Sequence, residues 1–422
     1  MSDPTAFFRS VAAEHRRCFW LDGGGAREWS GRRSIIGWLA DDDSSLSWSA
    51  ARREVSLHAG GGSAVVGDDV FDVLEQRVAA GEQWFGYLGY ASRTDLPATP
   101  DPTLPDAVWM RPRAVRVFEH GVASSVPSSV SPLERGDRLL EGVAKASRSQ
   151  DPPPSSYAAA FARVQEHLHA GNSYEVNLTH RLSRTSDLDP VTAYLALREL
   201  NPAPYSGFLQ HDVAGARAWL LSSSPERYAL VTADRHLETK PIKGTTPRGA
   251  TPEEDERHRE RLARDPKTRA ENLMIVDLLR NDLSTVCEVG SVEVPTLMEV
   301  ESYESVHQLV STVRGRLRDD VSTVAALRAL FPAGSMTGAP KLRTMEIIEE
   351  VEATPRGAYA GAFGWISGDG PADLGVVIRS LMTDGSGTWT LGTGGGITVK
   401  SDVTEEWAEA GWKAERLLRV FG

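Results

Sequence analysis

Residues 392–396 read Gly-Thr-Gly-Gly-Gly, and they run directly into Ile397-Thr398-Val399. The β-branched residues that follow indicate that the segment continues as a strand. A dinucleotide-binding glycine fingerprint has to open a helix, so this segment is not one. Glycines within a strand mark a bulge or the close approach of another group to the backbone. If it is a close approach, a ligand and a tightly packed sheet are equally good candidates for the approaching group.

A second glycine-containing segment, Gly334 to Lys341, reads Gly-Ser-Met-Thr-Gly-Ala-Pro-Lys. The phosphate loop of nucleotide-binding proteins requires adjacent Gly and Lys followed by Ser or Thr, whereas here Ala339 and Pro340 intervene and Leu342 follows. The sequence therefore argues against nucleotide binding. The segment can still present backbone N–H groups and a hydroxyl at the start of a helix, which suits a carboxylate ligand.

Charge and composition exclude several classes of protein. The 422 residues carry 46 Lys and Arg against 58 Asp and Glu, a net charge of −12, with 41% hydrophobic and 25% charged residues. These values are ordinary for a globular protein, and a net negative chain has no general attraction for nucleic acid. The two cysteines, Cys18 and Cys287, are too few for a disulfide framework.

No apolar run of the sequence approaches the roughly 18 residues that a membrane span needs. Met1 to Ser10 also lacks the basic and hydrophobic segments of a secretory signal. We therefore expect a cytoplasmic protein with no nucleic-acid partner and no membrane partner.

A boundary near residue 155 divides the chain. We expect an N-terminal β-rich subdomain with a linker at 1–155 and a second domain at 156–422. In the first part, short aromatic-containing runs between Gly-rich turns indicate strands, with one helix at 70–80. The linker is the polar stretch 126–156, which has one short helical pattern around 139–146 and a Pro- and Ser-rich end.

The second part contains both helix and strand patterns. Helices are expected at 157–170, 190–200, 271–283, 341–351 and from Asp402 onward, and strands at 174–179, 218–222, 226–231, 236–243, 360–366, 374–382 and 388–400. The dense charge run 253–271 is typical of a solvated face or a mobile loop.

Glu271 shares a helical stripe with Met274, Ile275 and Leu278, so its carboxylate points toward the apolar surface that the helix buries. Carboxylates are almost never buried without a partner. The alternative is that Glu271 lies in the first turn, favours the positive end of the helix dipole and stays in water. Pattern alone slightly favours this second interpretation.

Five further polar residues have an ordinary interpretation beside a functional one. Glu409 and Lys413 stand one turn apart on the polar face of the last helix, most often a surface ion pair worth about 0.3 to 0.5 kcal/mol. A lysine at the position of Lys243 is usually exposed, and His307 is more often a satisfied core histidine than a catalyst. Arg379 lies in an apolar strand, and a buried guanidinium needs an anionic partner.

Taken together, the order and the residues of several segments resemble those of the chorismate-utilising enzymes, most closely the aminodeoxychorismate synthase component I branch of that family. The resemblance spans residues 157 to about 415, and Gln83 to Tyr90 resembles the aromatic segment of the family's N-terminal subdomain. The matching segments are Ser173–Thr179, Ser224–Tyr228, Pro241–Thr245, Glu271–Met274, Asp277–Leu278, Arg280–Leu283, Gly334–Lys341, Tyr359–Gly361 and Gly394–Gly396.

The resemblance implies an α+β fold in which two antiparallel sheets pack face to face, with helices outside. It also implies a Mg²⁺ ion held by Glu271 and Glu409, since Mg²⁺ takes a few carboxylates and keeps water and substrate oxygens. The residues that match substrate-binding positions of the family are Thr245, His307, Thr337, Tyr359, Arg379, Gly394, Gly396 and Lys413.

The resemblance further implies that Lys243 and Glu226 are catalytic. Lys243 matches a nucleophile that attacks C2 of chorismate while the C4 hydroxyl departs, and Glu226 matches the acid that protonates this hydroxyl. Ammonia then adds at C4 and the lysine leaves, which gives 4-amino-4-deoxychorismate for p-aminobenzoate formation. The lysine needs a pKa of about 7 to 8, which we expect from burial and nearby cations in a locally positive site, while Glu226 needs a raised pKa.

Two alternatives to this function stay open. Anthranilate synthases resemble the chain elsewhere but have Ala at the position of Lys243, and a non-catalytic paralogue would bind chorismate or an amidotransferase without turnover. Glu175 departs from the family, because amine-transferring relatives often have Gln there and water-adding relatives have a Lys base. Neither cysteine lies in the Gly-x-Cys-x-Gly context of a glutaminase, so we expect ammonia from a separate glutamine amidotransferase subunit.

Overall fold

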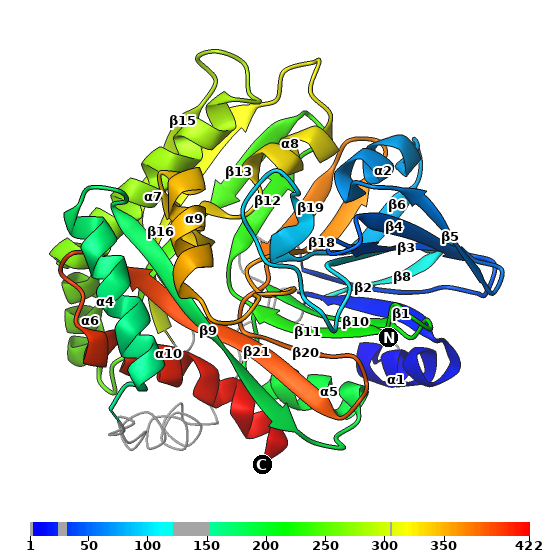
Figure 1. The fold of residues 1–422 in the computed structure, drawn as a ribbon, viewed down its shortest axis with the longest axis horizontal. Coiled ribbons are helices and arrows are strands. Elements are labelled where there is room, and N and C mark those ends of the chain that lie inside the picture. Colours follow the sequence, from blue (N-terminus) through cyan, green and yellow to red (C-terminus); the bar gives the residue numbers. More distant parts are fainter. Residues whose placement is uncertain (1–2, 24–31, 121–151, 304–305) are drawn as a thin grey trace.

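Two antiparallel sheets lie face to face and carry helices on the outside, which confirms the expected α+β architecture (Figure 1). The computed structural model describes residues 3–23, 32–120, 152–303 and 306–422. The short helical pattern expected around 139–146 and most of the expected linker lie outside the described residues. No helix in the described ranges is both long and apolar enough to cross a membrane.

One sheet has nine strands among the described residues. Their order is β17 (Gly338–Ala339), β9 (Glu175–Thr185), β21 (Thr388–Ile397), β20 (Ser380–Thr383), β11 (Ala218–Ser224), β10 (Tyr205–His211), β1 (Arg17–Asp22), β2 (Arg33–Trp38) and β8 (Val115–Glu119).

In the part of the chain that the structure describes, the other sheet has twelve strands. Their order is β14 (Ile242–Pro247), β16 (Val306–Arg316), β13 (His236–Lys240), β12 (Arg227–Val231), β19 (Ala372–Val376), β18 (Ala362–Ser367), β6 (Gln83–Leu88), β7 (Ala107–Arg111), β3 (Ser44–Ser49), β4 (Glu54–Ala59) and β5 (Gly62–Gly67), and β15 (Glu293–Ser302) pairs with β16.

The strands before residue 120 extend both sheets instead of forming a sheet of their own. Strand β1 pairs with β10, and β6 pairs with β18. Phe19 of β1 stacks on Phe85 of β6 with ring centroids 4.2 Å apart, so the aromatic core lies between the sheets. The boundary predicted near residue 155 therefore does not divide the core, which is continuous from the N-terminal strands to the C-terminal ones.

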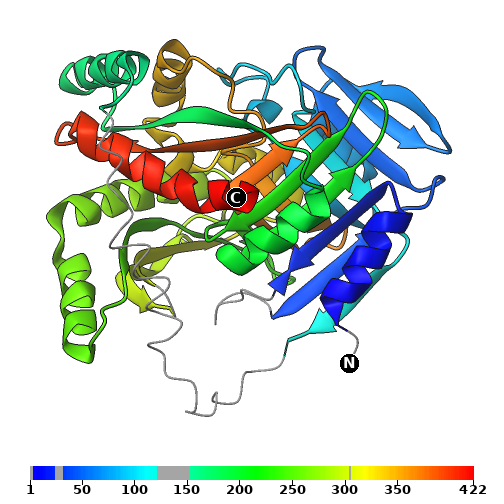
Figure 2. The ribbon, with the colours of Figure 1, turned by 90° about the horizontal axis from the view of Figure 1, so that it is seen from below.

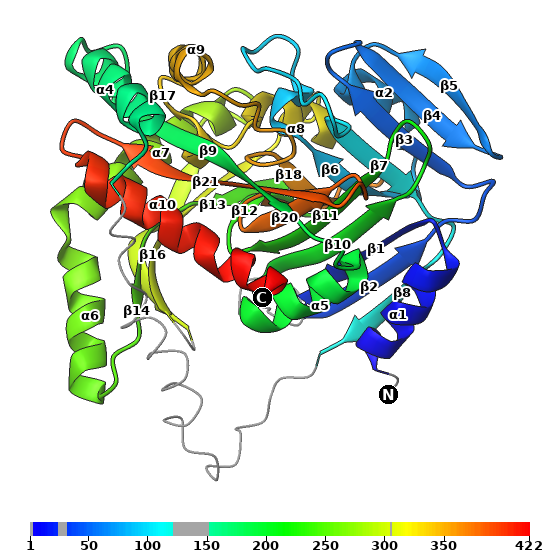
Figure 3. The same cartoon turned by 60° about the horizontal axis from the view of Figure 1, so that its bottom comes forward.

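The helices of the structure are α1 (Pro4–Glu14), α2 (Val70–Arg77), α4 (Ser155–His169), α5 (Pro190–Leu200), α6 (Pro252–Arg264), α7 (Pro266–Ser284), α8 (Thr323–Leu330), α9 (Lys341–Val351) and α10 (Val403–Leu418). Figure 3 shows α1, α5 and α10 along the outer face of the nine-stranded sheet, where their apolar residues form one cluster. Figure 2 shows α4 and α9 together at one end, where they cover β9 and β21.

Local signals explain where several helices begin. Asp189 accepts a hydrogen bond from the Thr192 amide and precedes Pro190, and Asp402 caps α10 by accepting from two backbone amides. The charge run expected to be a solvated face or loop contains helix α6, whose N-cap is Thr251 and whose first turn carries Glu253, Glu254 and Asp255. That placement favours the helix dipole.

Two predicted strands are wrong because each of them is broken. Segment 374–382 is divided between β19 and β20, which lie in opposite sheets, so the chain crosses from one sheet to the other at 377–379. Segment 236–243 is divided at Pro241 into β13 and β14, both paired with β16. The register shifts between Ile242 and Thr245, where Gly244 has a φ of 80°, and such a bulge re-aims the side chains around it.

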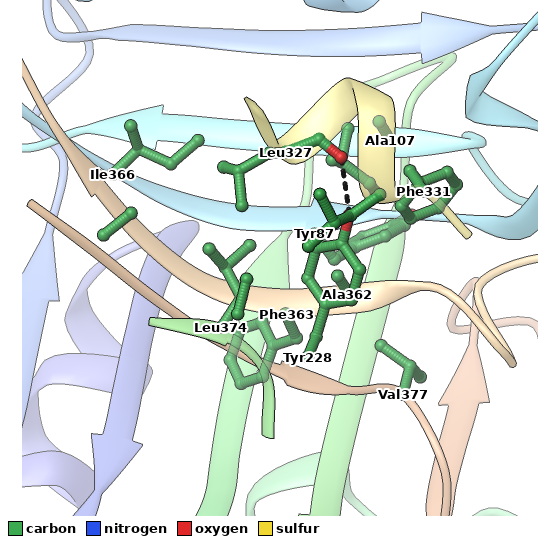
Figure 4. Packing of buried hydrophobic residues seen from close by; sticks show 14 of the residues in the cluster. Tyr87, Ala107, Tyr228, Leu327, Phe331, Ala362, Phe363, Ile366, Leu374 and Val377 are labelled. Carbon is green, nitrogen blue, oxygen red and sulfur yellow. Dashed lines mark hydrogen bonds between the residues drawn. The ribbon is translucent and has the colours of Figure 1, made fainter. Parts of the chain in front are cut away.

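Tyr228 anchors helix α8 to the core between the sheets (Figure 4). Its ring is buried, and its hydroxyl donates to the backbone oxygen of Leu327 at 2.6 Å. Tyr228→Phe should therefore lower the free energy of unfolding by about 1 kcal/mol, the usual net worth of such a bond. Urea unfolding measures the change. Tyr174→Phe is the matched control, because this ring is 71% exposed, and equal stability of both variants would contradict the expectation.

Candidate active site

The glycine-rich strand β21 is paired along only one of its edges near its end. It pairs with β9 from Thr388 to Ile397, whereas its ladder with β20 includes only Thr390 and Trp389. Within the described residues, the edge beyond Thr390 has no neighbouring strand. The backbone oxygen of Gly394 instead accepts a hydrogen bond from Lys413 Nζ of α10 at 2.8 Å. A side chain rather than a strand therefore contacts this edge.

Lys243 extends from the bulge in β14 and meets Glu175, the first residue of β9. Its Nζ donates to Glu175 Oε1 at 2.5 Å. The exposed fractions of the two side chains are 12% and 1%, and Glu175 Oε2 is buried without a hydrogen-bond partner. Because β14 and β9 belong to different sheets, this ion pair connects the two sheets at the site.

Gly396 lies directly beneath the ion pair. A Cβ atom at this position would be 2.1 Å from Glu175 Oε1 and 3.2 Å from Lys243 Nζ. The close approach inferred from the sequence is confirmed, and the approaching group is an ion pair of the protein itself. A residue larger than glycine would displace it.

The predicted pKa of Lys243 is wrong for this arrangement of protein groups. Burial acts to lower the pKa, as expected, but the carboxylates of Glu175, Glu271 and Glu226 outweigh it and raise the pKa above its usual value. The expected locally positive site therefore contains several carboxylates beside Lys243. For Lys243 to become a neutral amine, positive charge must offset these carboxylates or a nearby group must accept its proton.

Glu226, just before β12, has the raised pKa that the sequence analysis required of an acid. Its side chain is buried, which raises its pKa to about 7, while the Ser335 hydroxyl and the positive charge of Lys243 act in the opposite direction. Ser335 donates to Glu226 Oε1 at 2.6 Å. Near neutral pH this carboxyl group holds a proton in a substantial fraction of molecules.

Glu271 is the sixth residue of α7, so the interpretation that places it in water in the first turn is wrong. Its side chain is 15% exposed, and burial raises its pKa to about 7. Glu271 Oε1 accepts no hydrogen bond, and Lys267 Nζ is 3.9 Å away. This ammonium also contacts Glu406 of α10 at 2.9 Å, so Lys267 bridges two carboxylates.

Glu409 and Lys413 form the predicted ion pair, with 2.7 Å between Glu409 Oε1 and Lys413 Nζ. The Glu409 side chain is 52% exposed, and the charge of Lys413 lowers its pKa. Within the described residues, no three carboxylate, imidazole or thiolate side chains are close enough together to hold a metal ion by themselves.

Arg379 lies at the crossover between the two sheets with a φ of 52°. Its Nη1 donates to the backbone oxygen of Lys413 at 2.9 Å, and no carboxylate among the described residues lies within 4.0 Å of its guanidinium. Burial lowers its pKa to about 10. Burial also raises the pKa of the neighbouring Tyr359 to about 12. The anionic partner expected for Arg379 is therefore not a carboxylate of the described chain.

Three other predicted residues make contacts within the protein. His307 is buried, with Nε2 2.9 Å from Asp255 Oδ1 and Nδ1 2.8 Å from Ser302 Oγ, so both ring nitrogens have partners within the protein. Thr337 is buried and donates to the Gly334 backbone oxygen at 3.2 Å. Thr245 is exposed, and its hydroxyl accepts from Gln308 Nε2 at 3.5 Å. Their roles toward a substrate stay predictions.

Sequence reasoning missed three residues of the site. Glu406 precedes Glu409 by three positions and Lys267 precedes Glu271 by four, so helical spacing could have found both. Ser335 lies in the segment first compared with a phosphate loop, but its bond to Glu226 joins residues 109 positions apart. No local pattern predicts that contact.

Comparison with known proteins gives one family and several relatives. The family model described as chorismate binding enzyme matches residues 17–419. Aminodeoxychorismate synthase of Streptomyces pristinaespiralis is 38% identical over 99% of this chain and 64% of its own length. Aminodeoxychorismate synthase component 1 of Escherichia coli (strain K12) is 44% identical over 62% of this chain and 57% of its own length. The chain thus spans less than two thirds of either relative.

Anthranilate synthase component I of Streptococcus pneumoniae has a similar solved structure. The TM-score is 0.73 at 26% sequence identity, and the match covers 93% of both chains. The fold of the chain is therefore shared almost from end to end with a solved protein of known architecture.

The contact between Gly396 and the ion pair can be tested by Gly396→Ala. We expect the free energy of unfolding to fall by about 1 to 3 kcal/mol, as for other overpacked interiors. Gly411→Ala in α10 is the control, because an added Cβ there meets no atom within 4 Å, and alanine in a helix should raise stability by about 0.5 to 1 kcal/mol. Parent-like stability of the Gly396→Ala variant would contradict the close approach.

Proposed function

The chain belongs to the family of chorismate binding enzymes, and we propose that it aminates chorismate at C4 to give 4-amino-4-deoxychorismate, a precursor of p-aminobenzoate. The observation that carries this proposal is the buried ammonium of Lys243, held in the same site as the protonatable Glu226. The relatives named aminodeoxychorismate synthase support the same reaction.

In the proposed reaction, Lys243 is the nucleophile and Glu226 is the acid. The lysine amine attacks C2 of chorismate, the double bonds shift, and the C4–O bond breaks as Glu226 gives its proton to the departing hydroxyl, which leaves as water. Ammonia then bonds to C4 while the bond between C2 and the lysine nitrogen breaks. A pKa near 7 suits the acid, because the group must hold a proton and still release it.

The two carboxylates of chorismate require cationic partners and N–H or O–H donors. Arg379 supplies a guanidinium without a carboxylate partner in the described chain, and Lys413 supplies an ammonium. Tyr359 lies close to Arg379 and contributes a hydroxyl. We assign supporting contacts to Thr245, His307, Thr337 and the backbone of Gly394 and Gly396.

The donor set fits a Mg²⁺ ion at the acidic side of the site. Glu271 has a buried oxygen without a hydrogen bond, and Glu409 and Glu406 lie on the neighbouring helix α10. Lys267 already lies among these carboxylates, and all three of them raise its pKa. Glu271 and Glu409 would hold the ion, with Glu406 beside them, and water and substrate oxygens would complete the shell. The ion would supply positive charge to a ring carboxylate of the substrate.

We assign the ammonia supply to a separate glutamine amidotransferase subunit in the cytoplasm. Cys18 and Cys287 are both buried, and burial raises the pKa of both thiols. A glutaminase nucleophile needs a thiolate that substrate can reach. Neither cysteine of these 422 residues meets that requirement, which supports an ammonia-releasing nucleophile outside them.

Anthranilate formation is the rival reaction, because the similar solved structure carries that name. The reactions differ in where the amine ends, at C4 in one case and at C2 in the other. A lysine that occupies C2 directs ammonia to C4, so Lys243 favours the proposed product. The remaining alternative is a paralogue that binds chorismate without consuming it.

The position of the amine on the product tests the proposal. Purified protein supplied with chorismate, Mg²⁺ and ammonium chloride should consume chorismate and form a product with nitrogen at C4, identified by mass spectrometry and NMR. Fluorescent anthranilate would refute the assignment. Chorismate binding without any loss of chorismate would favour the non-catalytic paralogue.

Glu271→Gln tests the metal ligands. Removing the negative charge should raise the Mg²⁺ concentration needed for half-maximal binding by about 10- to 100-fold, as loss of a metal-site group commonly does, and calorimetric titration measures it. Glu260→Gln is the control, because this residue lies on the exposed surface of α6 with a side chain that is 52% exposed. Superimposable Mg²⁺ titrations of the Glu271→Gln variant and the parent would contradict the metal role.

A further inference from the structure

We propose that Glu175 is the positioning residue that accepts the proton of Lys243, so that the nucleophilic amine forms inside the site without release of a proton to solvent. This inference rests on the proposed function and names one step within it. It assigns to Glu175 a task that neither Glu226 nor the carboxylates of α7 and α10 are placed to perform.

The geometry selects Glu175 from the acidic groups around Lys243. Its Oε1 lies 2.5 Å from Lys243 Nζ, a hydrogen-bond distance along which a proton can move. Glu226 instead accepts from Ser335, and Glu271 accepts no hydrogen bond. Among the described residues, Glu175 is the one carboxylate within 4.0 Å of this ammonium.

The Lys243–Glu175 pair is enclosed by the protein. The Glu175 side chain is 1% exposed, and Oε2 is buried with no donor to stabilise a negative charge. In a water-poor interior, a neutral amine and a neutral carboxylic acid avoid the desolvation cost of two charges. Gly396 has no side chain, so none from this position separates Lys243 from Glu175.

The other charged groups near the pair act in known directions. The carboxylates of Glu226, Glu271 and Glu409 stabilise the ammonium form of Lys243. The cationic neighbours on α7 and α10 are Lys267 and Lys413. β21 contributes only glycine backbone beside the pair. A Mg²⁺ ion held by Glu271 and Glu409 would offset their negative charge near Lys243.

The protons of Lys243, Glu175 and Glu226 balance over the whole reaction. Transfer converts the ammonium and the carboxylate into an amine and a carboxylic acid, with no net change in charge. The freed lone pair of Lys243 forms the bond to C2 as the C4 hydroxyl leaves with the proton of Glu226. When ammonia has bonded to C4 as an ammonium group, this group returns a proton to Glu226. The lysine leaves C2 as a neutral amine and takes its own proton back from Glu175.

The pH dependence of Glu175→Gln tests this step. In the parent, proton transfer within the Lys243–Glu175 pair produces the neutral amine. Lowering the pH therefore does not reduce the fraction of the reactive amine. In the variant, Lys243 must lose its proton to solvent, so the ratio of variant to parent kcat/KM for chorismate should fall about tenfold for each pH unit on the acid side. Taking the ratio at each pH cancels the ionisation of ammonia and of Glu226.

Three outcomes decide the inference. A ratio that falls toward acid pH supports it, and a ratio that is constant with pH assigns Glu175 a structural role and overturns it. If the Gln variant does not fold, Glu175→Asp replaces it, because its shorter carboxylate still accepts the proton. This variant should keep a constant ratio to the parent, and a ratio that falls toward acid pH would overturn the inference.

Glu166→Gln on the exposed surface of α4 is the matched control and should follow the parent at every pH. Failure of the proposed function gives a different result. If the parent itself forms no 4-amino-4-deoxychorismate, the reaction assignment falls. If the parent forms it and Glu175→Gln keeps the parent's pH profile, only the role of Glu175 falls.

Discussion

A buried ammonium beside a buried carboxylate is the interaction on which the site depends. Lys243 and Glu175 come from different sheets, and their 2.5 Å contact lies over the bare backbone of Gly396. Buried ion pairs contribute little net stability, because desolvation offsets the attraction between the charges. The placement of this pair at the centre of the candidate site is therefore better explained by chemistry than by folding.

The fold supplies this centre through irregularities in otherwise regular sheets. The bulge between Ile242 and Thr245 aims Lys243 inward, and the crossover at 377–379 places Arg379 where the two sheets separate. The early end of the β20–β21 ladder leaves Gly394 free to accept from Lys413. These three departures from regular sheet geometry position residues of the candidate site.

Local chemistry made much of the secondary structure predictable, whereas contacts between distant segments did not follow from it. Helices with clear caps, such as α5 after Asp189 and α10 after Asp402, follow the sequence closely. The predicted strand 374–382 failed because sheet membership depends on partners far along the chain. The two-sheet architecture and the site residues came from the resemblance of ordered motifs, since no periodicity reveals that N-terminal strands extend both sheets. The expected lowering of the pKa of Lys243 rested on burial and nearby cations, whereas in the structure the carboxylates of Glu175, Glu271 and Glu226 raise it.

Covalent bonding of Lys243 to the substrate is tested most directly by trapping. The protein is incubated with chorismate and Mg²⁺ in the absence of ammonia, quenched in acid, digested and analysed by mass spectrometry. The account predicts that the peptide containing Lys243 carries the substrate skeleton less one water. An unmodified peptide from protein that releases the C4-aminated product at its normal rate once ammonia is added would contradict it.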